Sequence, residues 1–259
     1  MKMLIFIQLL FLVVLDSKGQ NFTGKVEYKS ILDFGKQNSE LQNPEISLDK
    51  KKQIEQMKSS LIELEEHTYI LNFNMHESSY RKEERLGIKD RLNAAANVLD
   101  FYKNFKDNIY IKEFDASGTI FHISERLPVF DWKLQNETQT IAGHICYKAI
   151  QSEIKESIKR VMSPTGGIEQ SIIKDTITTV AWYCPDIPVS NGPDKFFGLP
   201  GLIMSIVKTS EFGGMPLTLY ATQITLNPKE GVRVKRPKTK RLYSPAEFQL
   251  EMLKLSSGH

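Results

Sequence analysis

Alternating apolar and polar positions run through most of the chain, and this period of two predicts β-strands. In residues 24–32 the alternation places Val26, Tyr28 and Leu32 on one face, and residues 68–75 repeat the pattern. Short links between successive strands favour antiparallel pairing, because parallel neighbours need long crossovers. The same reasoning predicts strands at residues 140–150, 176–184, 202–207 and 216–226, and a hairpin over residues 108–124 with its turn at residues 115–118.

A period of three to four predicts two helices. Ser47 is suited to cap a helix that starts near Leu48, with a narrow apolar stripe of Ile54, Met57, Leu61 and Leu64. In residues 244–247 a serine, a proline and a glutamate have the spacing of a capping box, so a helix follows with Phe248, Met252 and Leu255 toward the protein body.

Two polar segments interrupt these elements. A third helix is compatible with residues 92–102, within the charged stretch 81–106, and residues 154–174 are predicted to be a long exposed loop. Residues 20–259 are therefore expected to form one domain. We predict the α+β class, with a predominantly antiparallel sheet that strand twist can curve and two or three peripheral helices.

The first 19 residues have the composition of a secretory signal peptide. Lys2 precedes an apolar run over residues 3–15, and small residues follow at Ser17 and Gly19. We therefore expect export, with cleavage near Gly19; no cysteine follows the run to carry a lipid anchor. The remaining chain holds 32 basic and 30 acidic side chains, and this near-neutral balance gives no global reason to expect an anionic partner.

Two cysteines, Cys146 and Cys184, remain in the exported chain. An even count in an oxidising compartment favours a disulfide, and closing a loop of 38 positions would stabilise the fold by about 4 kcal/mol. Two separate buried thiols are the alternative. His144 lies two residues before Cys146 and could begin a metal site with it, but a disulfide would exclude that site.

Residues 195–206, with the sequence KFFGLPGLIMSI, contain two glycines and a proline between bulky apolar residues. Leu199, Pro200, Gly201 and Leu202 suit a type II turn, because proline presets the second position and glycine accepts a positive φ at the third. Gly198 and Gly201 would also let the backbone approach its neighbours closely. The turn at Gly198, Leu199, Pro200 and Gly201 is therefore structural or binds a partner.

The string FFGLPGLI at residues 196–203 resembles the signature of the GLPGLI family, exported proteins of Bacteroidetes. Residues 132–149 and 181–193 resemble family segments that precede it, so the GLPGLI-like core covers about residues 132–206. The resemblance implies a protein of a Gram-negative envelope and a link to outer-membrane TonB-dependent transporters. It implies no enzyme activity, and no catalytic residues are carried over.

The chain contains no P-loop, dinucleotide-binding, zinc-protease or serine-hydrolase motif. We therefore predict no catalytic residues, no metal and no cofactor. The segment of residues 228–242, called here the basic segment, is suited to contact anionic lipid headgroups or an acidic protein face rather than nucleic acid, and a solvated edge strand is the alternative. The residues predicted for this contact are Arg233, Lys235, Arg236, Lys238, Lys240 and Arg241.

The leading hypothesis is a non-enzymatic envelope protein, in the periplasm or associated with the outer membrane, that acts as a binding or accessory subunit of an outer-membrane complex. Its partner would be a transporter or another envelope protein, with contact to the membrane surface. A carrier that holds an apolar ligand such as lipid in a curved sheet is the alternative. A hydrolase would need acids or histidines gathered in a pocket from distant segments.

Overall fold

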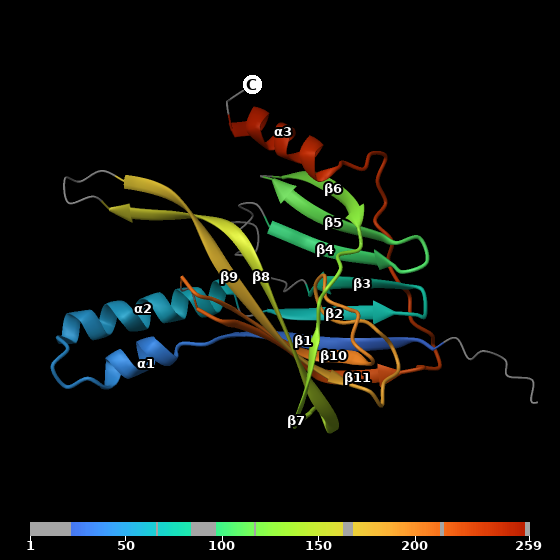
Figure 1. Ribbon diagram of the computed structural model, residues 1–259, viewed down its shortest axis with the longest axis horizontal. Helices are drawn as coiled ribbons and strands as arrows, with labels where there is room; N and C mark the ends of the chain where they lie inside the picture. The colour runs from blue at the N-terminus through green and yellow to red at the C-terminus, as the bar shows by residue number, and fades with distance from the viewer. Residues whose placement is uncertain are drawn as a thin grey trace, which may run out of the picture.

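The computed structural model describes residues 22–65, 67–83, 97–116, 118–162, 168–212 and 215–256; the expected signal peptide lies outside them. In these residues eleven strands form one antiparallel sheet in the order β6-β5-β4-β3-β2-β1-β11-β10-β9-β8-β7 (Figure 1). The elements are β1 (Gly24–Leu32), α1 (Gly35–Gln42), α2 (Leu48–Glu65), β2 (Thr68–Phe73), β3 (Glu77–Lys82), β4 (Asn97–Asn104), β5 (Ile109–Ala116), β6 (Thr119–Arg126), β7 (Lys133–Ile141), β8 (His144–Met162), β9 (Ile168–Cys184), β10 (Leu202–Ser210), β11 (Leu217–Leu226) and α3 (Pro245–Ser256).

The prediction of an α+β fold is wrong, because the sheet supplies the core and the three helices of the described residues lie at its margins (Figure 1). Helix α2 does have Ser47 as its cap, with the Lys50 N–H 3.3 Å from the Ser47 Oγ. Its apolar stripe buries Ile54 but leaves Met57 41% exposed. A helix that buries so little apolar area is an appendage of the sheet rather than a second layer of the core.

Strand β1 joins two halves of the sheet, because it pairs with β2 on one side and with β11 on the other. The sheet then curls, and in Figure 1 the long β8–β9 hairpin runs obliquely across the flatter array of β1 to β6. Val26 and Tyr28 of β1 belong to the same buried cluster as Cys184 and Met204 of the other half. The core therefore lies on the concave face of one curled sheet.

Three predicted segments take a different form. Residues 140–150 are two strands, because Ala142 and Gly143 have φ values of 48° and 82° and make a two-residue hairpin turn between β7 and β8. Of the predicted loop 154–174, residues 154–162 and 168–174 continue β8 and β9, paired residue by residue, and residues 163–167 lie outside the described residues. Residues 97–102 belong to β4, so the helix considered over residues 92–102 is wrong there, and residues 92–96 lie outside the described residues.

Several local predictions are confirmed. The predicted strand over residues 24–32 is β1, and the β5–β6 turn is closed by the Gly118 N–H, which donates to the Asp115 Oδ1 at 2.6 Å. The capping box of α3 is present, since the Ser244 N–H donates to the Glu247 Oε2 at 2.7 Å and the Glu247 N–H to the Ser244 Oγ at 3.2 Å. The expectation for Leu255 is wrong, because this residue was predicted to face the protein body and is 51% exposed.

Candidate functional site

The loop between β9 and β10, residues 185–201, carries the glycine-proline motif and is called here the signature loop. It lies against the concave side of the sheet, where Ile187 and Val189 join the main buried cluster. Phe196 and Leu199 belong to a second buried cluster with Ile203 of β10. The loop therefore fills the concave face with its own apolar side chains, although it has no regular secondary structure.

The turn of the motif is tighter than the predicted type II turn. The Gly201 N–H donates to the Leu199 carbonyl at 2.8 Å, which encloses Pro200 in a three-residue turn, and the Leu202 N–H donates to the Ile187 carbonyl at 3.1 Å. Gly201 has a φ of 148°, and a Cβ there would lie 2.2 Å from the Cys184 carbonyl oxygen. Glycine is therefore required at this position for packing inside the protein.

Gly198 also has a positive φ, of 93°, and its N–H donates to the Ser190 Oγ at 3.0 Å. The indole of Trp132 lies beside it, and the indole N–H donates to the Phe197 carbonyl at 2.9 Å. Phe130 packs at a tilt against Trp132 and Phe196, at ring-centroid distances of 5.6 and 5.2 Å. Two of the sequence segments that carry the family resemblance thus contact each other.

Lys103 of β4, in the opposite half of the sheet, forms hydrogen bonds with the backbone of the signature loop. Its ammonium donates to the carbonyls of Gly192, Asp194 and Phe196 at 2.8, 3.1 and 3.1 Å, and the residue is fully buried. Burial lowers the pKa of Lys103 to about 7, and the Asp194 carboxylate opposes this shift. The three carbonyls supply the hydrogen bonds that a buried ammonium needs.

Sequence reasoning missed Lys103, because it lies in a charged stretch whose structure the pattern left undecided. Its position was the available signal: Lys103 follows Phe101 by two residues, so both point to the same face of β4. Nearby, the Tyr80 hydroxyl and the Asn191 side-chain N–H₂ are buried without a hydrogen-bond partner among the described residues.

Cys146 and Cys184 lie at the register position that continues the β8–β9 pairing from Tyr147 and Tyr183. Both are fully buried, and the Cys146 thiol donates to the His144 carbonyl at 3.5 Å. Burial raises the pKa of the Cys146 thiol to about 12 and also raises the pKa of Cys184. The pairing of β8 with β9 therefore brings the two predicted cysteines together. Both are thiols in the structure, and the disulfide between them stays a prediction.

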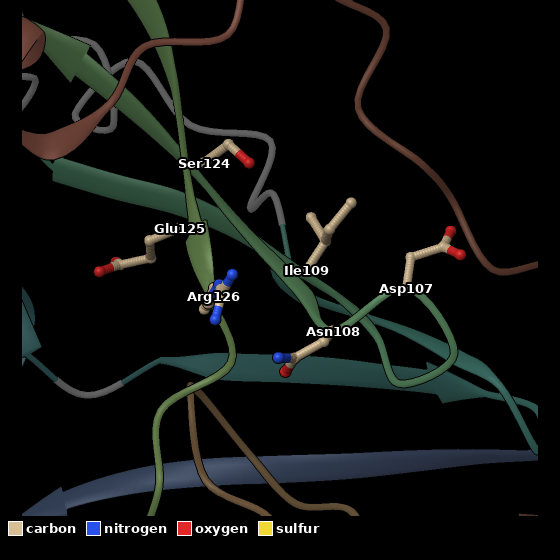
Figure 2. Close-up of a pocket in the computed structure, with 6 residues that line it drawn as sticks. All are labelled: Asp107, Asn108, Ile109, Ser124, Glu125 and Arg126. Carbon is tan, nitrogen blue, oxygen red and sulfur yellow. The ribbon is translucent and has the colours of Figure 1, made fainter.

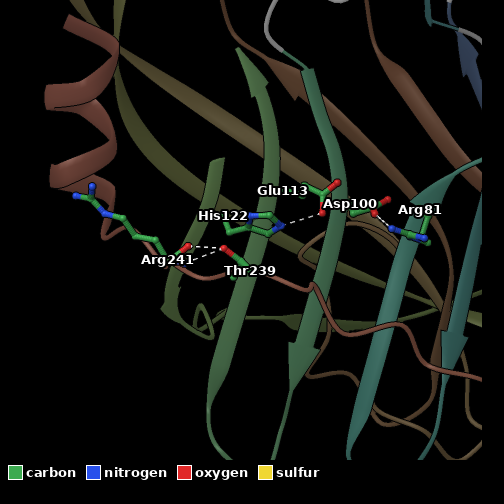
Figure 3. A network of polar contacts seen from close by, with 6 residues as sticks. All are labelled: Arg81, Asp100, Glu113, His122, Thr239 and Arg241. Carbon is green, nitrogen blue, oxygen red and sulfur yellow. Dashed lines mark hydrogen bonds and ion pairs between the residues drawn. The ribbon is translucent and has the colours of Figure 1, made fainter. Parts of the chain in front are cut away.

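The opposite face of the sheet carries a row of directly opposed polar side chains on β3 to β6, shown in Figure 3: Arg81, Asp100, Glu113 and His122. Arg81 pairs with Asp100, and the His122 Nε2 lies 3.1 Å from the Glu113 Oε2. The row is the described group that most resembles an acid–base constellation, but each carboxylate already has a partner. No group of three or more metal-binding side chains occurs in the described part of the chain.

A surface pocket of about 530 Å³ lies where the β4–β5 turn meets the end of β6. Figure 2 shows that its lining side chains diverge, with Glu125 pointing away from Asp107. Glu125 instead pairs with Lys112 at 2.7 Å. The pocket therefore lacks the convergent polar groups of a catalytic site. Its lining consists of Asp107, Asn108, Ile109, Ser124, Glu125 and Arg126.

The basic segment crosses the polar face from the end of β11 to β6 without forming the edge strand considered above. The Lys235 N–H donates to the Ser79 Oγ at 3.2 Å, and the Arg236 guanidinium lies 5.8 Å from the Tyr102 ring. At the far end, Tyr243 pairs with the backbone of His122 and Ser124. The six basic side chains predicted to contact an anionic surface are all exposed: Arg233, Lys235, Arg236, Lys238, Lys240 and Arg241.

None of the helices described in the structure is both long and apolar enough to cross a membrane. Two regions are candidates for the functional site. One is the buried contact of the signature loop with Lys103 and Trp132, and the other is the exposed basic segment.

Residues 132–205 match the model of a family described as a protein of unknown function (Porph_ging). The matched residues make up less than a third of the chain. A comparison with the curated proteins finds no match. The match begins at Trp132 and ends within β10, so it covers the signature loop and the strands that hold it.

Among solved structures, the chain is similar to PNGF-II in the P21 space group, with a TM-score of 0.50 and 16% identity over 90% of this chain and 33% of that chain. PNGF-II in the C2 space group gives a TM-score of 0.48 and 16% identity, over 91% of this chain and 33% of that chain. At this identity the first likeness shows the fold alone. The chain spans about a third of the length of PNGF-II.

Proposed function

We propose that this chain is a GLPGLI-type exported protein that acts, without chemistry of its own, as a binding or accessory subunit of an outer-membrane complex. The observation that carries the proposal is the filled concave face. Ile187, Phe196 and Leu199 of the signature loop occupy the space that a carrier would offer to an apolar ligand. The partner, in this proposal, binds the outside of the molecule.

Two further features support an outward-facing role over an enzymatic one. The carboxylates of the polar row are held by Arg81 and His122, so neither resembles a free general base. The six exposed cations of the basic segment form no ion pair with any described residue, and a surface of one sign is suited to an anionic partner. The expected signal peptide and the family resemblance direct the proposal to the periplasm or the outer membrane.

Photo-crosslinking in the native envelope would test the proposal. A photoreactive residue replaces Lys238 in the basic segment, and a matched control replaces Lys50, an exposed lysine in α2. After irradiation and tagged purification in mild detergent, we expect the Lys238 probe to yield a discrete adduct with an envelope protein. Recovery of the bait alone from both probes, or the same adducts from both, would contradict an accessory subunit that binds through this surface.

A further inference from the structure

The far ends of β8 and β9 extend from the body of the sheet as a two-stranded arm, defined here as residues 154–162 and 168–174 (Figure 1). Strand β7 pairs with β8 only as far as Ile150, and β10 pairs with β9 only as far as Ile177. Within the described residues, neither edge of the arm is paired with a further strand. Two of its residues, Ile154 and Ile172, are 71% and 74% exposed. Because an isolated pair of strands is only marginally stable in water, the arm is suited to gain neighbours.

The fold does cover one of its other sheet edges. Beside β6, the Ser124 N–H donates to the Tyr243 carbonyl at 2.8 Å, and the Tyr243 N–H donates to the His122 carbonyl at 2.8 Å. In the arm, the outer edge of β8 has no such cover from the described part of the chain, and it contains neither a proline nor a register shift. Prolines and bulges are common means of preventing an edge from pairing with another chain. This edge can therefore accept a further strand.

We propose that the outer edge of β8 in the arm pairs with the same edge of a second copy of this chain. The two arms then form an antiparallel four-stranded sheet, in the order β9-β8-β8-β9, around a two-fold axis. The backbone groups of both edges gain partners, and each arm gains the additional strands that a hairpin needs for stability. The inference goes beyond the proposed function and does not rest on it.

Charge selects the register in which the two copies pair. A two-fold axis perpendicular to the sheet places one residue opposite its own copy, and residues at equal distances on either side of it lie opposite each other. Centres at residues 156, 159 and 160 place Glu156, Lys159 or Arg160 opposite its own copy. A centre at residue 157 places Lys155 opposite Lys159. A centre at Ile158 instead places Glu156 opposite Arg160 twice and no like charges opposite each other.

The register centred on Ile158 also fits beside the neighbouring strand. It pairs residues 154–162 with residues 162–154 of the second copy, so it ends before Ile150, where Lys133 of β7 already occupies the edge. Centres closer to the body would place the second copy against β7. Acidic and basic residues alternate along this edge, so its charges complement a copy of itself better than a partner of one charge sign.

Sedimentation equilibrium of the exported chain tests the inference. We expect a monomer–dimer equilibrium that Glu156→Arg weakens about 30-fold, because both symmetric pairs change from opposite to like charge. Arg160→Glu should weaken it by a similar factor. The double variant, Glu156→Arg with Arg160→Glu, exchanges the two signs and should restore the dimer. The matched control is Glu55→Arg, which reverses an exposed acid of α2 outside the arm and should leave the equilibrium unchanged.

Three results would overturn the inference. The first is a chain that stays monomeric up to a concentration of about 1 mM. The second is a dimer that Glu156→Arg and Glu55→Arg affect equally, and the third is a double variant that dimerises no better than the single variants. Circular dichroism and thermal unfolding of every variant separate a lost interface from a lost fold.

The two proposals fail separately. If the Lys238 probe yields an adduct with an envelope protein but the chain stays monomeric, the accessory role is kept and the arm dimer is wrong. If the charge exchange restores a dimer but no adduct forms, the arm dimer is kept and the accessory role is wrong.

Discussion

The signature loop and the basic segment are both irregular and both contain glycine and proline, yet they differ in what determines their conformation. In the signature loop, Phe196 and Leu199 are buried, and three carbonyls accept hydrogen bonds from Lys103. In the basic segment the charged side chains face solvent, and Gly231 has open space around it. Irregular backbone inside a protein needs partners for its polar groups, whereas exposed backbone has water.

This difference separates two roles that a glycine can have. Gly201 and Gly231 both have a positive φ, but only Gly201 lies against a backbone that cannot move away, that of Cys184. A family signature can thus mark residues that are needed for folding.

The largest effect should come from Gly201→Ala compared with Gly231→Ala. The Gly201 variant places a Cβ on the Cys184 carbonyl, and we expect it to lose about 5 kcal/mol of unfolding free energy. Gly231→Ala adds only the cost of a positive φ and should lose about 1 kcal/mol. Urea denaturation followed by circular dichroism measures both. Similar losses in the two variants would show that the loop and the segment are not differently constrained.

The second effect concerns the cysteines beside Gly201. In the exported protein we expect a Cys146–Cys184 disulfide, and its reduction should lower the free energy of unfolding by about 4 kcal/mol. Intact mass under non-reducing conditions checks the bond first, and denaturation with and without reductant then measures its effect. A mass that matches the fully reduced chain would refute the disulfide.

A smaller effect, on pH dependence, should come from Lys103. Its pKa is about 7 in the folded chain and 10.5 ordinarily, so between these values the unfolded chain binds the extra proton. The free energy of unfolding therefore rises with pH between about 7 and 10.5, by up to about 1.4 kcal/mol per unit. Lys103→Met should lose this slope and also about 2 kcal/mol of stability, because three carbonyls lose their donor.

Lys195 provides the control for the pH experiment, because burial lowers its pKa as well, but the donor to the three carbonyls is the ammonium of Lys103. Lys195→Met should keep most of the slope. If Lys103→Met keeps the pH dependence of the unfolding free energy and Lys195→Met loses it, Lys195 is responsible and the prediction for Lys103 is wrong.

Local patterns determined much of the secondary structure. The alternation around Val26 and Tyr28 predicted β1, and the spacing of Ser244 and Glu247 predicted the start of α3, because both features depend on neighbouring residues alone. The same local reasoning missed the turn at Ala142 and Gly143 and mistook polar strand residues beyond 154 for a loop. A hairpin that extends beyond the core has no buried face, so its sequence lacks the apolar alternation of a strand.

The tertiary structure alone decided how the distant segments meet. The sequence determined that residues 198–201 form a turn requiring glycine, but the reason, the Cys184 carbonyl, is a contact across strands. It likewise determined that the basic segment is charged, but only the fold placed it across the polar face. Lys103 could not be linked to the signature loop from sequence, because about ninety residues separate them and only the curl of the sheet brings them together.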